Sequence, residues 1–462
     1  MTVDILPDVA LLEIFNFYMD ELHNLEEDHI EPWHTLVHVC GKWRNVVFGS
    51  PRRLGLRIYY KARTPVRKML DLWPPLPIAV TVFSPKERDV DNIIAVLEHN
   101  VRICEIDITN GPSLKRSQFE RLLAAMQRPF PALTRLVLAF EYETAPAIPA
   151  LFLGECAPRL QTFRLGRIPF PGLPTLLLSA THLVHLDLWK IPHSGYISPE
   201  AIVTCLSTLI RLESLVIKFE SPRSRLDRKN QKPPPQTRTL VPVLTELWFQ
   251  GTSDYFEDLV ARVHAPLLDK LRALFFHQLI FDTPELAQFI SRTPKFRTHD
   301  EARVFFSLRV IYVTLPQTLD GKLELGILCR QPDWQVSSLA QVCTSLPRAL
   351  FSMVERLYFQ SSDLSLYWQD DIDNSQWLEF LRPFTAVKGF YLPKIFVPLV
   401  VPALQELVGE RATEVLPALQ TLFLDKPHPS DPVQEAIGQF VSARQLSGHP
   451  IAISRRVNKW ND

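Results

Sequence analysis

Two histidines have the spacing of a metal site. His34 and His38 lie four residues apart, which places both side chains on one face of an expected helix. No Glu or Cys on that helix completes a ligand set, so a solvated helix face is the favoured interpretation.

The catalytic patterns G-x-S-x-G, G-x-x-x-x-G-K-[ST] and G-x-G-x-x-G do not occur in the sequence. We therefore expect no catalytic residues, no cofactor and no enzymatic activity.

A second candidate metal site begins at Asp371. The run Asp371, Asp373 and Ser375 opens like a calcium-binding loop. The sixth position of such a loop requires glycine and the twelfth requires a bidentate glutamate, but Gln376 and Arg382 stand there. The sequence therefore predicts no calcium site.

Composition restricts the class of protein. The formal net charge of the 462-residue chain is +0, so no overall field attracts nucleic acid or an anionic membrane. The sequence has no apolar run long enough to span a bilayer and no basic leader, and its six cysteines form no C-x-x-C pair. We expect free, buried thiols in a cytoplasmic and/or nuclear protein. The low glycine count of 15 and high proline count of 39 favour short elements joined by stiff connections.

The frame L-x-x-L-x-L recurs along the chain at intervals of about 23 to 46 residues. Its copies begin at Ile103, Leu133, Leu160, Leu183, Leu212, Leu244, Leu271, Leu308, Val354, Val387 and Leu419. The last four positions alternate apolar with any residue, which is the period of a strand with one buried face. Helical spacing precedes several copies, as at Leu114–Met126, Phe256–Val263 and Leu286–Ile290. Strands that alternate with helices predict a parallel sheet.

The repeat resembles leucine-rich-repeat proteins over roughly Val101 to Leu424. The asparagine that usually follows the strand in that family is missing, so we expect an irregular solenoid with a curved parallel sheet. Between Val313 and Val354 either a degenerate unit at Leu323–Leu328 or an insertion is expected.

Residues 1–50 predict a separate helical module. Pro7 and Asp8 suit the first turn of a helix over Asp8–Leu22, which is apolar on all but one narrow stripe and so needs partners on more than one side. A second helix is expected from Pro32 to the Gly49-Ser50-Pro51 stop.

The order L-P, L-x-x-I-F and V-C-x-x-W-R resembles the F-box, including the variant F-boxes joined to ragged leucine-rich repeats in fungi. The resemblance implies docking to the Skp-type adaptor of a cullin–RING ubiquitin ligase, with the repeats binding a substrate protein. The implied adaptor contacts are Leu6, Pro7, Leu11, Leu12, Phe15, Val39 and Trp43. The alternative is a leucine-rich-repeat scaffold whose N-terminal helices only cap the array.

The segment between the frames at Val354 and Val387 is the expected substrate contact. It offers Tyr367, Trp368, Asp370, Asp371 and Asp373, which combine aromatic contact area with carboxylates for a basic partner segment. The alternative is that Trp368 and Trp377 pack inward and the loop only closes a turn. The basic, proline-rich segment Ser221–Thr239 is expected to be a surface loop, or else a contact for an acidic substrate.

The sequence thus predicts an α/β chain of three parts. An F-box-like helical module occupies residues 1–50, a linker and solenoid cap 51–100, and the leucine-rich-repeat-like solenoid with its C-terminal cap 101–462. The expected partners are proteins, with no nucleic acid and no membrane.

Overall fold

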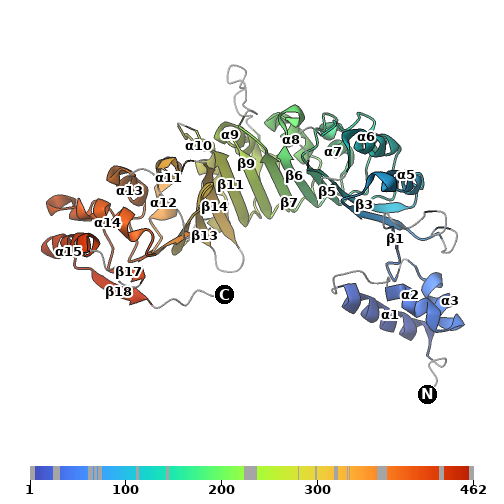
Figure 1. The fold of residues 1–462 in the computed structure, drawn as a ribbon, viewed down its shortest axis with the longest axis horizontal. Helices are drawn as coiled ribbons and strands as arrows, with labels where there is room; N and C mark the ends of the chain where they lie inside the picture. The colour runs from blue at the N-terminus through green and yellow to red at the C-terminus, as the bar shows by residue number, and fades with distance from the viewer. Residues whose placement is uncertain are drawn as a thin grey trace. The chain divides into compact units, whose positions relative to one another are not determined.

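The computed structural model places the chain in two compact units, residues 1–183 and 184–462. It describes residues 6–23, 32–51, 53–60, 66, 70, 75–110, 114–141, 145–222, 237–278, 280–296, 299–316, 321–329, 331, 333–361, 372–425 and 431–456. Figure 1 shows the helices that follow residue 85 along one face of the strands within each unit. Among the described residues, no helix has the length and apolar character that a membrane span requires.

Unit 1 opens with three helices. These are α1 (Asp8–His23), α2 (Pro32–Val39) and α3 (Gly41–Gly49). The helix over Asp8–Leu22 is confirmed, but the expectation of one helix after Pro32 is wrong. The chain leaves helical geometry at Cys40, whose sulfur accepts a hydrogen bond from the backbone N–H of Trp43 at 3.5 Å and so caps α3.

Five parallel strands of unit 1 follow one another in the order of the chain. They are β1 (Ile58–Tyr60), β2 (Ile78–Phe83), β3 (Ile103–Asn110), β4 (Arg135–Phe140) and β5 (Thr162–Gly166). The helical elements between them are η2 (Glu87–Asp89), α5 (Val90–Leu97), α6 (Arg116–Ala125), η3 (Phe152–Glu155) and α7 (Leu173–Ser179). The sheet begins before residue 101, because β1 and β2 lie within the segment expected to be a linker and cap.

The strands of unit 2 depart once from chain order. In sheet order they are β6 (His185–Ile191), β7 (Ser214–Phe219), β9 (Glu246–Gly251), β11 (Lys270–Phe276), β14 (Lys322–Leu328), β13 (Val310–Pro316), β12 (Glu301–Phe306), β15 (Arg356–Ser361), β16 (Gly389–Leu392), β17 (Thr421–Asp425) and β18 (Ala452–Arg456). A small separate pair joins β8 (Thr239–Leu240) to β10 (Val263–His264). The basic segment expected to be a loop lies outside the described residues from 223 to 236.

The helical elements of unit 2 connect these strands. They are η4 (His193–Gly195), α8 (Pro199–Leu206), α9 (Ser253–Arg262), α10 (Pro284–Arg292), η6 (Pro294–Phe296), α11 (Asp333–Ser345), α12 (Arg348–Phe351), α13 (Asn374–Leu381), α14 (Val397–Gln405), η7 (Gly409–Thr413) and α15 (Asp431–Leu446). The helices expected before the frames at Leu133, Leu271 and Leu308 are confirmed as α6, α9 and α10.

The repeated frame explains the register of the strands. In the copies at Leu133, Leu160, Leu183, Leu212 and Leu244 the first leucine precedes the strand and is buried; at Leu212, for example, the backbone N–H donates to the carbonyl of Leu209 at 3.1 Å. The fourth positions of neighbouring copies pair across the sheet, as Leu186 does with Leu215 and Leu215 with Leu247. Ten of the eleven copies lie in parallel strands. The chain is therefore a mixed α/β repeat with a predominantly parallel sheet, as predicted.

Two copies of the frame were placed wrongly. In β11 the partner of Leu247 is Leu271, so the frame in register begins at Leu268, three residues before the expected start. The copy at Leu308 falls in β13, which pairs antiparallel with both β12 and β14. The expected degenerate copy at Leu323 is β14, which is parallel to β11. An antiparallel strand has the same two-residue period as a parallel one, so the apolar pattern could not distinguish them.

The free cysteines are not uniformly buried. Cys205, Cys329 and Cys343 are buried, Cys40 and Cys104 are half-buried, and Cys156 is exposed. The expectation of free thiols agrees with the structure, whereas the expectation that all six are buried is wrong.

Candidate protein-binding surfaces

The three N-terminal helices bury part of the predicted adaptor-binding set. Leu11 and Phe15 are fully buried and Leu12 is 6% exposed, while the rings of Phe15 and Trp43 lie 4.8 Å apart. Trp33 is also fully buried and donates from Nε1 to the carbonyl of Arg57 at 3.0 Å. The buried side chains of Leu11, Leu12 and Phe15 therefore hold the helices together. They could affect the binding of a partner only by fixing the structure of the module, because a partner could not contact them directly.

The remaining predicted contacts lie on the surface of the module. Leu6 is 38% and Val39 54% exposed, Pro7 is exposed, and Trp43 is half-buried. Helix α1 adds three apolar side chains that the sequence reasoning did not include. Val9 is 62%, Ile14 48% and Phe17 74% exposed. We call Leu6, Val9, Ile14, Phe17 and Val39 the helical apolar patch.

The predicted substrate loop is placed only at its end. Tyr367, Trp368, Asp370 and Asp371 lie outside the described residues. Asp373 is exposed and its carboxylate accepts a hydrogen bond from the backbone N–H of Ser375 at 3.0 Å, which caps α13. Trp377 is fully buried, as the alternative for this tryptophan expected.

The face of the unit 2 sheet that lacks helices carries the third and fifth positions of each frame. On the opposite face the fourth and sixth positions pack against helices, as Phe249 stacks on Phe256 of α9 at 4.5 Å. We call the helix-free side the open face. Five copies have an aromatic residue at the fifth position, and we call these residues the aromatic row: Trp248, Tyr312, Tyr358, Tyr391 and Phe423. Tyr358, Tyr391 and Phe423 are in register on adjacent strands. Four strands with Arg272, Glu324, Thr314 and Arg303 at that level separate Trp248 from Tyr358, and Tyr312 lies opposite Gly326 and Phe305 instead.

Neighbouring rings of the aromatic row stack across the strands. The rings of Tyr358 and Tyr391 lie 4.1 Å apart at 13°, and those of Tyr391 and Phe423 lie 4.1 Å apart at 1°. Tyr312 stacks on Phe305 at 4.8 Å. The stacked rings therefore restrict one another's rotamers, and Tyr358 is only 8% exposed.

Two glycines leave room for this row. A Cβ atom at Gly326 would lie 2.5 Å from Cβ of Tyr312 and 2.6 Å from the carbonyl oxygen of Ile311. A Cβ atom at Gly389 would lie 3.3 Å from the ring of Phe423. The aromatic side chains thus occupy the space that a residue larger than glycine would need at positions 326 and 389.

Cations cover both sides of Trp248. Lys218 Nζ lies 2.8 Å and the guanidinium carbon of Arg272 lies 4.5 Å from the centre of the indole ring. Burial lowers the pKa of Lys218 to about 8, although Asp187 and Glu246 act in the opposite direction. The cations and the ring form a contiguous amphipathic surface.

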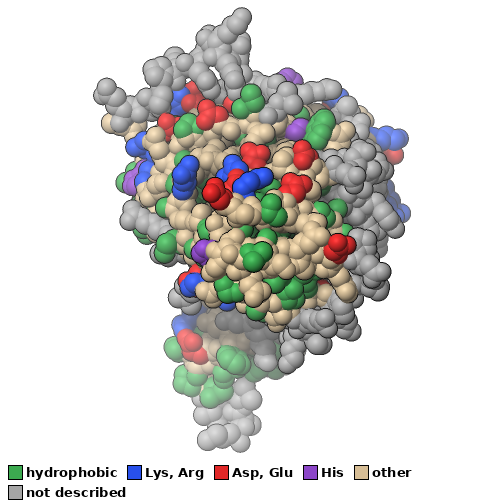
Figure 2. All heavy atoms as spheres, turned by 90° about the vertical axis from the view of Figure 1, so that its left-hand side faces the viewer, with side chains coloured by type: hydrophobic (Ala, Val, Ile, Leu, Met, Phe, Trp, Pro, Cys, Tyr) green, Lys and Arg blue, Asp and Glu red, His purple; other side chains and the backbone are tan. Residues whose placement is uncertain are grey.

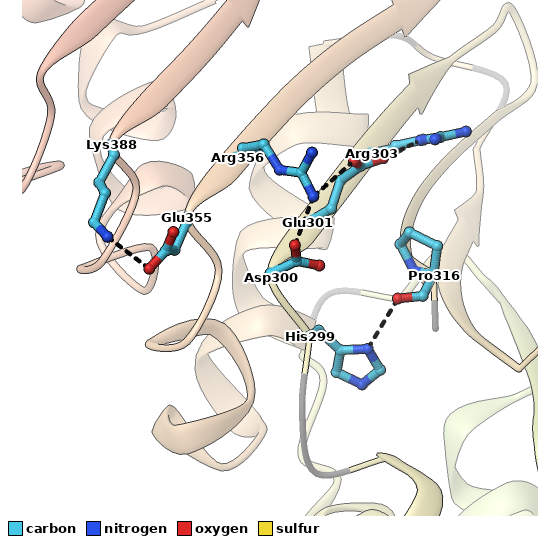
Figure 3. Close-up of polar contacts among 8 residues, drawn as sticks. All are labelled: His299, Asp300, Glu301, Arg303, Pro316, Glu355, Arg356 and Lys388. Atoms are coloured by element: carbon cyan, nitrogen blue, oxygen red, sulfur yellow. Dashed lines mark hydrogen bonds and ion pairs between the residues drawn. The ribbon is translucent and has the colours of Figure 1, made fainter. Parts of the chain in front are cut away.

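A polar network continues from the aromatic row to the starts of β12 and β15 (Figure 3). Arg356 Nη2 lies 2.5 Å from Asp300 and 3.6 Å from Glu301, whose other oxygen lies 2.6 Å from Arg303 Nε. Lys388 and Glu355 form a separate pair at 2.6 Å. These contacts hold charged side chains in place across neighbouring strands.

His299 occupies the frame position that a buried leucine usually fills. It is 3% exposed, and its ring nitrogens lie 3.2 Å from the carbonyl oxygen of Phe296 and 3.4 Å from that of Pro316. Figure 3 shows the ring pointing toward Pro316 at the end of β13. Burial lowers the pKa of His299, which favours the neutral ring.

Charges of both signs mix on the surface. Figure 2 views the C-terminal end of the chain, where acidic and basic side chains are interspersed. Within the described part of the chain, no group of three or more His, Cys, Asp or Glu residues could hold a metal ion. The face in this view therefore carries no single sign of charge.

The sequence contains a signal for the aromatic row that lies outside the predicted substrate contact. In the copies LTELWF, LRVIYV, VERLYF, VKGFYL and LQTLFL the outward fifth position is aromatic. In the copies from Ile103 to Leu212 the same position is Asp, Val, Arg, Asp and Val. The change of residue type along one outward position marks the surface.

These features define an α/β repeat protein with a predominantly parallel sheet and an N-terminal helical module. No protein-family model matches the chain, and no curated protein matches it either. Among solved structures, the leucine-rich repeat-containing protein LegL7 from Legionella pneumophila is 13% identical with a TM-score of 0.29. The match covers 85% of this chain and 98% of LegL7.

Proposed function

We propose that this chain is a non-enzymatic scaffold that binds a partner protein on the open face of unit 2. The observation that carries the proposal is the aromatic row. Tyr and Trp give large contact area at a small cost in rotamer entropy, and they are enriched at binding hot spots. Here the stack of Tyr358, Tyr391 and Phe423 already fixes part of that geometry, which reduces the ordering cost of binding further.

The finer proposal is that the N-terminal module docks to a Skp-type adaptor. The chain would then be the substrate-recognition subunit of a cullin–RING ubiquitin ligase, and the transfer chemistry would belong to other subunits. The L-P and V-C-x-x-W-R patterns support this role. So does the helical apolar patch, because a helix that exposes Val9, Ile14 and Phe17 together offers a hydrophobic face to another protein.

The adaptor role is tested by isothermal titration calorimetry with a purified Skp-type adaptor. The double variant Val9→Ser/Phe17→Ser changes only exposed side chains, so it should keep its fold and lose most adaptor affinity. The variant Leu6→Ala/Trp43→Ala should also lose binding, but Trp43 packs on Phe15, so its fold must be checked by circular dichroism. The matched control is Phe83→Ser, because Phe83 is 69% exposed in β2 and outside the module.

The expected result is tight binding by the parent and Phe83→Ser and weak binding by the two module variants. If the parent does not bind the adaptor, the three helices cap the repeats only, and the ubiquitin-ligase role is abandoned. The scaffold proposal would remain, because it rests on unit 2.

A further inference from the structure

Five adjacent strands of unit 2 carry an excess of basic side chains on the open face. At the third and fifth positions of β11, β14, β12 and β15 lie five cations, with β13 between β14 and β12. These cations are Lys270, Arg272, Lys322, Arg303 and Arg356. We call them the cationic strip. The same positions hold two carboxylates, Glu324 and Glu301.

The carboxylates lie beneath the cations. The side chain of Glu324 is 1% exposed, while its partners Arg272 and Lys322 are 36% and 49% exposed. The side chain of Glu301 is 11% exposed, while its partners Arg303 and Arg356 are 38% and 45% exposed. At these third and fifth positions the buried acids hold the cationic side chains in position, and the cations are the more exposed members of each pair.

Aromatic rings border the cationic strip on both sides. Trp248 lies against Arg272, and Tyr312 stacks on Phe305 in the middle of the strip. Tyr358 is on the same strand as Arg356 and continues into the stack with Tyr391. The surface therefore offers positive charge next to apolar contact area.

We infer that the cationic strip binds an extended acidic segment of the partner protein, with an apolar side chain of that segment against the neighbouring rings. The inference rests on the proposed scaffold function and names the chemistry of its partner. Four strand spacings of about 4.8 Å span about 19 Å, which equals about six extended residues at about 3.3 Å each. Charge complementarity at this length gives specificity and a fast association rate.

A peptide fits the strip better than a nucleic acid does. Asp300 borders the strip with a side chain that is 68% exposed, and Asp269 and Glu355 lie at the starts of neighbouring strands. These carboxylates interrupt the path that a continuous phosphate backbone would need. An acidic peptide can place its charges between them.

The test is fluorescence polarisation with the full chain and three labelled probes. The first is a 12-residue peptide of Glu and Asp with Phe at its centre, the second is its Lys counterpart, and the third is a 12-nucleotide single-stranded DNA. Lys270→Glu/Arg356→Glu reverses two charges of the strip, and Lys270→Gln/Arg356→Gln removes them more gently. Lys115→Glu/Arg116→Glu at the start of α6 is the matched control, because both side chains are mostly exposed and lie in unit 1.

The parent should bind the acidic peptide, and binding should weaken as salt is raised. The charge reversal should weaken binding about tenfold or more, the Gln variant less, and the control by under about twofold. Absence of binding by the parent, or equal binding of the Lys peptide, would overturn the inference. If the DNA binds more tightly than the acidic peptide, the partner of the strip is a nucleic acid and the peptide inference is wrong. Because no adaptor is present, these outcomes are independent of the adaptor titration above.

Discussion

Gly326 in β14 should be intolerant of a single methyl group. A Cβ atom there would lie 2.5 Å from Cβ of Tyr312, 2.6 Å from the carbonyl oxygen of Ile311 and 2.9 Å from Leu274 Cδ2. The first two atoms are fixed to the backbone of β13, so neither can move without the strand. Gly326→Ala should therefore push β13 away from β14 and tilt Tyr312 out of its stack with Phe305.

The magnitude follows from two opposing terms. Overpacking a close-packed site costs about 1–3 kcal/mol, whereas replacing glycine by alanine lowers the entropy of the unfolded chain and contributes about 0.4–1 kcal/mol of stability. The net loss should be about 1–2 kcal/mol. Gly438 provides the matched control: it lies inside α15 with no atom within 4 Å of an added Cβ. Gly438→Ala should stabilise the helix by about 1 kcal/mol.

Hydrogen exchange followed by mass spectrometry measures both effects locally, which suits a repeat protein whose parts need not unfold together. Peptides from residues 310–328 should lose protection in Gly326→Ala, and peptides from α15 should gain protection in Gly438→Ala. Unchanged protection of β13 and β14 in Gly326→Ala would refute the packing argument.

Further predictions concern single buried groups. Arg444 is fully buried and donates to the carbonyls of Ala412, Leu416, Pro417 and Leu419; Arg444→Met should lower the free energy of unfolding by about 2–4 kcal/mol in urea titrations, because the lost hydrogen bonds outweigh the removal of a buried charge. A parent-like midpoint would contradict this. Burial lowers the pKa of His299, so the unfolded chain binds more protons than the folded chain just below the ordinary value of 6.5, and stability should fall as the pH drops through that range. His299→Leu should flatten the pH dependence of thermal unfolding between about pH 5 and 7, since leucine does not titrate. If the slope is unchanged, the pH dependence of stability arises from other titratable groups. Exposed Cys156 should react with a thiol reagent first and buried Cys343 last, because burial also raises the pKa of the Cys343 thiol; equal rates in the folded protein would contradict the burial.

The apolar pattern predicted most of the fold because each strand buries its fourth and sixth frame positions. It misplaced β11, since the residues from Leu271 match the apolar frame better than those from Leu268, whose sixth position is Ala273. Only the pairing of Leu271 with Leu247 shows that the frame begins at Leu268. It also could not show that Leu11 and Phe15 face inward, because a helix apolar on most sides does not reveal which side meets its own chain. The aromatic residues at the fifth frame position can be found in the sequence. Their place on the open face follows only from the structure, which shows that this position faces away from the helices.

The reversed order of β12, β13 and β14 has a consequence for synthesis on the ribosome. In a simple solenoid each new repeat emerges next to one already folded, so the nascent chain can condense unit by unit. Here β12 emerges first but is separated from β11 by two strands, and β14, which lies beside β11, emerges last. A nascent chain that ends after β12 therefore has no finished edge for that strand to join. Growth from the N-terminal side must pause until the whole meander has left the exit tunnel, and only then can β15 extend the sheet from β12.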